Sequence, residues 1–76
     1  MPKIPTPTGQ ELITALKTIG FVVIRQKGSH VRMKHDDDRV VSIPVHAQKT
    51  LGKGLLLKIL RDVDLTKEDL IRLLNE

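Results

Sequence analysis

The spacing of apolar residues along the chain predicts helices and strands in the order α-β-β-β-α-α. Leu12, Ile13, Leu16 and Ile19 recur at the spacing of one helix face, whereas Val31 and the apolar residues after it alternate as in a half-buried strand. The expected helices cover about residues 9–19, 53–61 and 67–75, and the expected strands cover residues 21–26, 30–35 and 39–44.

Polar residues between these segments predict where each element begins and ends. Thr8 and Glu11 have the spacing of a capping box, Gly20 suits the end of the first helix, and Thr66 suits the start of the last one. The links 27–29 and 36–38 are too short for a crossover between parallel strands. The sequence therefore predicts an α+β fold in which a three-stranded antiparallel sheet packs its helices on one face.

The alternation in the second and third strands predicts which residues face the helices. That apolar set is Val31, Met33, Val41 and Ile43. Because side chains in a strand alternate between faces, His30, Arg32 and Lys34 are expected on the open face, in solvent. Residues 21–26 are apolar at positions of both faces, so they do not fix the register of their own strand.

The length and composition of the chain limit what it can contain. Its 76 residues suit one domain, residues 1–76, with a thin core and no room for a deep cofactor cavity. It has no cysteine, so disulfides and thiolate metal sites are excluded, which fits a reducing compartment. No signal peptide or membrane-spanning run is visible, and we expect a cytoplasmic protein with no membrane partner.

The charge balance favours a polyanionic partner, although many small soluble domains are also mildly basic. The formal net charge is +4 and the sequence pI is about 9.8. The chain has one Phe and no Trp or Tyr, so it lacks the aromatic platform on which single strands usually stack. If the partner is a nucleic acid, we expect contacts with phosphates, helix shape and 2′-hydroxyl groups.

His30 is the main candidate for catalysis. Cleavage of RNA through its own 2′-hydroxyl needs a base, an acid and cations that stabilise charge on phosphorus, and histidine titrates near neutrality. His30 follows Gly28 and Ser29 and precedes the cations Arg32 and Lys34. The alternative is an exposed strand histidine without a role.

The remaining candidates have simpler alternatives. His46 follows the third strand and is either a second catalytic candidate or a loop histidine bonded to backbone, while His35 and the aspartates 36–38 are interpreted as a solvated turn. Lys49 and Lys53 flank the start of the second helix, where free N–H groups suit either a phosphate or a solvated cap. We expect no cofactor and no metal site, because His30 and His35 point to opposite faces and no compact ligand spacing is present.

The order of these motifs resembles the HicA-type (YcfA-like) toxins of toxin–antitoxin pairs, from about Lys3 to Leu70. The matching segments are Gly20-Phe21, Arg25-Gln26-Lys27-Gly28-Ser29-His30, Ile43-Pro44-Val45-His46, Lys53-Gly54-Leu55 and Ile59-Leu60-Arg61. The resemblance implies a fold like that of double-stranded-RNA-binding domains, with α-β-β-β-α order plus a short C-terminal helix. It further implies metal-independent cleavage of mRNA with the catalytic histidine at His30, and inhibition by a HicB-type antitoxin.

The candidate substrate-binding residues accompany His30 in these segments, in the open-face pattern and beside the start of the second helix. They are Arg25, Lys27, Ser29, Arg32, Lys34, His46, Lys49 and Lys53. Two other hypotheses remain open at this point. A non-catalytic RNA-binding module would need only the basic face, and a protein-interaction domain would bind no RNA even at low salt.

Overall fold

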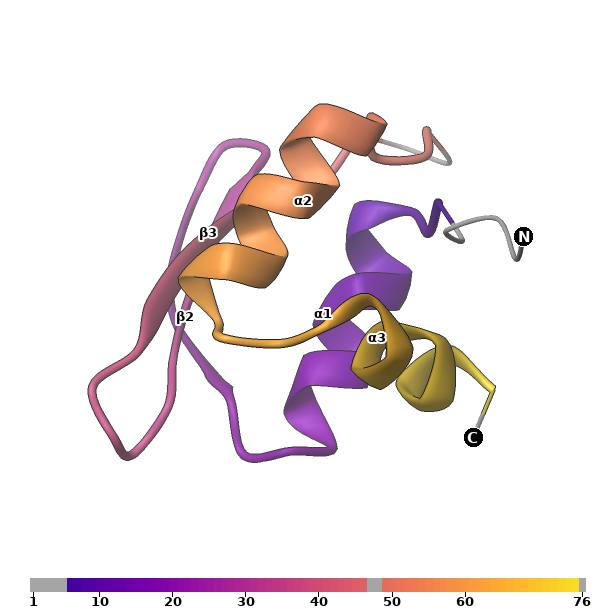
Figure 1. Cartoon of the computed structure of the whole chain (residues 1–76). Helices are drawn as coiled ribbons and strands as arrows, with labels where there is room; N and C mark the ends of the chain where they lie inside the picture. Colours follow the sequence, from indigo (N-terminus) through magenta and orange to yellow (C-terminus); the bar gives the residue numbers. More distant parts are fainter. Residues whose placement is uncertain (1–5, 47–48, 76) are drawn as a thin grey trace.

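A computed structural model describes residues 6–46 and 49–75 and contains the expected elements in the expected order (Figure 1). They are α1 (Gly9–Lys17), β1 (Val22–Lys27), β2 (His30–Lys34), β3 (Val40–Pro44), α2 (Lys53–Asp62) and α3 (Lys67–Leu74). The predicted element types and their order are confirmed, and the boundaries differ from the predicted ones by only one or two residues. The expected loop before α2 includes residues 47–48, which lie outside the described part.

Two capping boxes fix the starts of α1 and α3. The Thr8 hydroxyl accepts a hydrogen bond from the Glu11 N–H at 3.1 Å, and the Glu11 carboxylate accepts one from the Thr8 N–H at 2.9 Å. Thr66 and Asp69 repeat this arrangement at 3.1 and 3.0 Å. These bonds satisfy N–H groups that the first turn of a helix leaves free, and each cap is worth about 1 kcal/mol. By contrast, α2 begins after Gly52 without a side-chain cap.

The three strands form an antiparallel sheet in the order β1-β2-β3. The helices lie together on one side of this sheet, with α3 beside α1 (Figure 1). The α+β fold with helices on one sheet face is therefore confirmed, and its layout is consistent with that of a double-stranded-RNA-binding domain. Within residues 6–46 and 49–75, no helix combines the length and apolar character needed to cross a bilayer.

A β-bulge in β1 reconciles two demands on that strand. Phe21 enters the core just before the strand and is 1% exposed, so strict alternation from it would send Arg25 toward the helices. The two-residue turn pairs Lys27 with His30 on the open face. Arg25, two residues before Lys27, must therefore also face away from the helices. The register shifts between Val23 and Arg25, and the extra residue, Ile24, allows both placements.

The core lies between the sheet and the helices. The four apolar residues expected to face the helices, Val31, Met33, Val41 and Ile43, are all buried, as predicted. The buried cluster contains Leu12, Ile13, Leu16, Phe21, Val31, Met33, Val41, Ile43, Leu51, Leu56, Ile59, Leu60, Val63 and Leu70. Burial of each large apolar side chain contributes about 1.5–3 kcal/mol, which fixes β2 and β3 against the helices.

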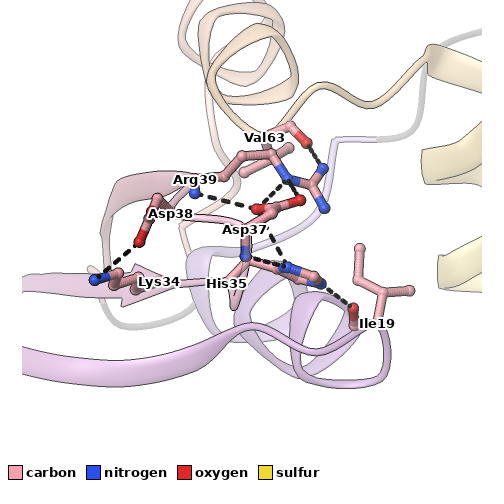
Figure 2. Close-up of polar contacts among 7 residues, drawn as sticks. All are labelled: Ile19, Lys34, His35, Asp37, Asp38, Arg39 and Val63. Carbon is pink, nitrogen blue, oxygen red and sulfur yellow. Dashed lines mark hydrogen bonds and ion pairs between the residues drawn. The ribbon is translucent and has the colours of Figure 1, made fainter.

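The turn between β2 and β3 is fastened to the rest of the fold by His35 and Arg39 (Figure 2). His35 Nε2 donates to the Ile19 carbonyl at 3.0 Å, and its ring meets the edge of Phe21 with the centroids 5.0 Å apart. Arg39 donates to both Asp37 carboxylate oxygens and to the Val63 carbonyl. The hydrogen bond from Arg39 lowers the pKa of Asp37. His35 is thus a turn residue, as predicted, and in addition a structural contact between the turn and the segment that joins α1 to β1.

Candidate functional site

The open face of the sheet contains a hollow of about 220 Å³ lined by residues of all three strands. Its walls are Arg25, Lys27, His30, Arg32 and Ser42. All five residues are exposed, on the side of the sheet opposite the helices. The exposed, open-face position predicted for His30 and Arg32 is therefore confirmed.

The strand register sets which side chains are neighbours in this hollow. Lys27 is opposite His30, Arg25 is opposite Arg32, and Arg32 is opposite Ser42. Directly opposed residues on one face have Cβ atoms about 4.5–5.5 Å apart, and residues two apart in a strand are separated by roughly 7 Å. A phosphate group placed between β1 and β2 is thus within reach of one imidazole and three cations.

The turn before β2 gives His30 its position. Gly28 and Ser29 form a two-residue connection, and Gly28 adopts φ +58°, a conformation that glycine provides at little cost. The Ser29 carbonyl accepts a hydrogen bond from the Val45 N–H at 2.6 Å. This bond extends the β2–β3 pairing past Pro44, which has no N–H to donate, and secures the turn next to His30.

The charge of the hollow is positive and uncompensated by its strands. β1, β2 and β3 contain no acidic residue. Arg25 and Arg32 face each other directly, and like charges in such cross-strand pairs are destabilising by roughly 0.2–1 kcal/mol. Binding of an anion between these cations would offset their repulsion. Their guanidinium and ammonium groups are suited to donate to phosphate oxygens.

The other candidate residues lie outside the walls of the hollow. Ser29 is in the adjoining turn, and His46, Lys49 and Lys53 are exposed between the end of β3 and the start of α2. Lys34 is four residues from His30, roughly 13 Å along β2, and its Nζ pairs with Asp38 at 3.3 Å. Lys34 therefore lies apart from the cations of the hollow, although the alternation of β2 predicts it on the same face as Arg32.

Ser42 is the one residue of the hollow that the sequence analysis did not select. Its signal was present in the alternation of β3, because Ser42 lies between the buried Val41 and Ile43 and must face outward. Its hydroxyl can donate to a phosphate oxygen beside Arg32.

A family model described as the HicA toxin of bacterial toxin–antitoxin systems matches residues 9–65, well over half of the chain. The chain belongs to the HicA toxin family. It is thus the toxin of a toxin–antitoxin system, for which the family implies an antitoxin partner. A search of the curated proteins finds no match.

The matched region of this HicA toxin runs from α1 past the end of α2 and contains the whole hollow. Of the helices and strands in the described residues, α3, which packs on α1, lies beyond it. Among residues 6–46 and 49–75, no three His, Asp or Glu side chains come together in a way that would hold a metal ion.

Proposed function

We propose that this toxin is an endoribonuclease that cleaves mRNA in the open-face hollow, with His30 as its catalytic residue. The observation that carries the proposal is the position of His30. It is exposed in a hollow whose other walls are Arg25, Lys27, Arg32 and Ser42. The family supports the assignment to a toxin, and the chemistry of the hollow supports RNA as the substrate.

The chemistry follows from the groups in the hollow. The 2′-hydroxyl of a nucleotide attacks the adjacent phosphorus while the bond to the 5′-oxygen of the next nucleotide breaks. This step leaves a 2′,3′-cyclic phosphate and a free 5′-hydroxyl. His30 serves as the base that removes the 2′ proton or as the acid that protonates the 5′-oxygen, and a water molecule makes the other proton transfer. One such transfer by a positioned side chain contributes about 10²–10⁴-fold.

The cations hold the phosphate and stabilise the charge that develops on it. Lys27, Arg25 and Arg32 donate to the non-bridging oxygens, and these cations, rather than a metal ion, stabilise the developing charge. Ser29, Lys34, His46, Lys49 and Lys53 extend the contact with the RNA backbone around the hollow. At α2, free N–H groups beside Lys53 add to this phosphate-binding surface.

The composition of the site predicts weak selectivity for RNA sequence. Phe21 is the single Phe and is buried, and the chain has no Trp or Tyr, so none of these rings is available for stacking with a base. Contacts with phosphates carry no direct sequence information. We therefore expect cleavage at many sites of an mRNA, limited mainly by access to the backbone.

Inhibition by a HicB-type antitoxin is part of this proposal. An antitoxin that covers the hollow blocks the access of phosphate to His30 and to the surrounding cations at the same time. We expect the complex of the two proteins to bury His30 together with Arg25 and Arg32.

Two labelled oligonucleotides of identical sequence, one RNA and one fully 2′-deoxy, test the proposed reaction. In the presence of EDTA, the toxin should cut only the RNA and leave 2′,3′-cyclic phosphate ends. Cleavage of the deoxy strand would refute attack by the 2′-hydroxyl. Salt-dependent binding of RNA without any fragments would instead support the alternative function, a non-catalytic RNA-binding module.

A further inference from the structure

We propose that β1 is the docking edge for the antitoxin, which adds an extended acidic segment beside it as a further strand of the sheet. This inference rests on the antitoxin-controlled function proposed above. It goes beyond coverage of the hollow, because it assigns the backbone of β1 and its apolar residues to the interface.

The two outer strands of the sheet differ in how well they are protected. β3 packs against α1 and α2, has two buried residues and ends at Pro44. β1 pairs with β2 on one side, and all six of its residues are exposed. Alternate backbone groups of an edge strand point outward, where a further strand can bind them.

The side chains of β1 also suit a protein partner. Val22, Val23 and Ile24 are 58%, 41% and 49% exposed, and they are three consecutive β-branched residues on an edge. Val23 is paired with the buried Met33, yet it remains partly exposed at the outer edge of the sheet. An added strand would cover this apolar end of β1 and gain the free energy of burying it.

The charge on β1 specifies the chemistry of the added segment. Arg25 and Lys27 project onto the open face, and β1 has no acidic residue of its own. A segment with apolar residues beside Val22 and Val23 and with Asp or Glu beside Arg25 and Lys27 satisfies both halves of the strand. Opposite charges in neighbouring strands are favourable, whereas like charges are not.

The same charges disfavour a second copy of this chain as the occupant. Antiparallel pairing of two β1 strands centred on Gln26 would place Arg25 of each copy opposite Lys27 of the other, next to two positive hollows.

Docking at β1 provides a direct means of inhibition. The carboxylates of the added strand would lie beside Arg25 and Lys27, the cations that hold the phosphate in the proposed reaction. Antitoxin and RNA then compete for the same side chains, so binding of one excludes the other.

The backbone amide of Gln26 reports on this docking. The residues that flank a two-residue turn form hydrogen bonds with each other, so the Lys27 N–H points toward β2. The N–H groups of successive residues in a strand point in opposite directions, so the Gln26 N–H points outward. Hydrogen exchange of ¹⁵N-labelled toxin, alone and bound to the purified cognate antitoxin, measures this amide. We expect its exchange to slow at least about tenfold in the complex.

Variants test the same edge by affinity. Gln26→Pro removes the outward N–H and should weaken antitoxin binding about tenfold, while RNA cleavage persists. Should this variant unfold, the double substitution Val22→Thr/Ile24→Thr keeps strand propensity and should also weaken binding. Leu55→Ala, at another exposed apolar residue on α2, is the matched control and should bind antitoxin normally.

The docking proposal would be overturned by an unchanged Gln26 amide in the complex, or by normal affinity of the β1 variants. A dimer of the toxin alone that protects Gln26 would identify a second copy as the occupant and would also overturn it. Amide exchange does not depend on RNA cleavage. Absence of nuclease activity would therefore contradict the proposed function, but the exchange of the Gln26 amide would still decide whether the antitoxin docks at β1.

Discussion

Arg25 and Arg32 lie directly opposite each other on β1 and β2, on the sheet face opposite the helices. Cross-strand pairs of like charge are unfavourable, and no acid on the strands relieves this one. The pair therefore lowers the stability of the sheet and raises its affinity for an anion. This trade between stability and binding underlies the first prediction.

Neutralising one arginine should separate stability from binding. Arg25→Gln should leave the free energy of unfolding unchanged or raise it by up to about 1 kcal/mol, because it removes the repulsion with Arg32. RNA affinity should fall, and the dependence of its logarithm on log salt should become shallower by about 0.7–0.9. Urea unfolding and RNA titrations at several salt concentrations measure both. Lys17→Gln, on α1, is the control and should keep the parent salt dependence.

Lys27 and Lys34 should differ in their importance for cleavage. Lys27 is paired with His30 across the turn, whereas Lys34 lies at the other end of β2 and pairs with Asp38. Lys27→Gln should lower the rate of RNA cleavage about tenfold, as expected for loss of one charge-assisted contact, and Lys34→Gln should have a smaller effect. Cleavage rates under single-turnover conditions measure the difference. Equal losses would show that the hollow is not the place where the phosphate reacts.

The connection between α1 and β1 should be sensitive to substitution at Gly20. This residue adopts φ +104°, and a Cβ atom there would lie 2.8 Å from His35 Nε2. Gly20→Ala should lower the free energy of unfolding by about 1–3 kcal/mol, because it strains the backbone and displaces His35. Gly54→Ala is the matched control. Its Cβ would meet nothing within 4 Å, and the helix should gain about 0.5 kcal/mol. Chemical unfolding compares the two, and equal stabilities would contradict the role of His35.

Stability should fall in acid through Asp37 and Asp69. The hydrogen bond from Arg39 lowers the pKa of Asp37, and the N–H and hydroxyl of Thr66 lower that of Asp69. Because both values are lower in the folded than in the unfolded chain, this stabilisation is complete above about pH 4 and is lost as pH falls through the folded values. Urea unfolding between pH 2 and pH 6 measures the slope. Asp37→Asn should flatten it, and an unaltered slope would contradict the assignment.

The local patterns of the chain predicted most of the fold and part of the site. The capping residues Thr8 and Thr66, and the alternation around Val31 and Met33, are interactions between near neighbours in sequence. They were sufficient to predict element order, the buried face and the exposure of His30.

Features that depend on contacts between elements could not be predicted in this way. The bulge at Ile24 arises because Phe21 is anchored in the core while the turn fixes Lys27, and residues 21–26 are apolar on both faces. The pairing of Lys34 with Asp38 and the contact of His35 with Ile19 likewise depend on how the β2–β3 turn folds back.

The most direct test of the central claim compares the parent toxin with His30→Ala on one labelled RNA in the presence of EDTA, with RNA affinity and thermal unfolding measured in parallel. His46→Ala, an exposed histidine outside the walls of the hollow, is the control and should lose much less activity. We predict that His30→Ala folds and binds RNA like the parent but cleaves it at least about 100-fold more slowly. Cleavage by this variant at the parent rate would contradict the assignment of His30 as the catalytic residue.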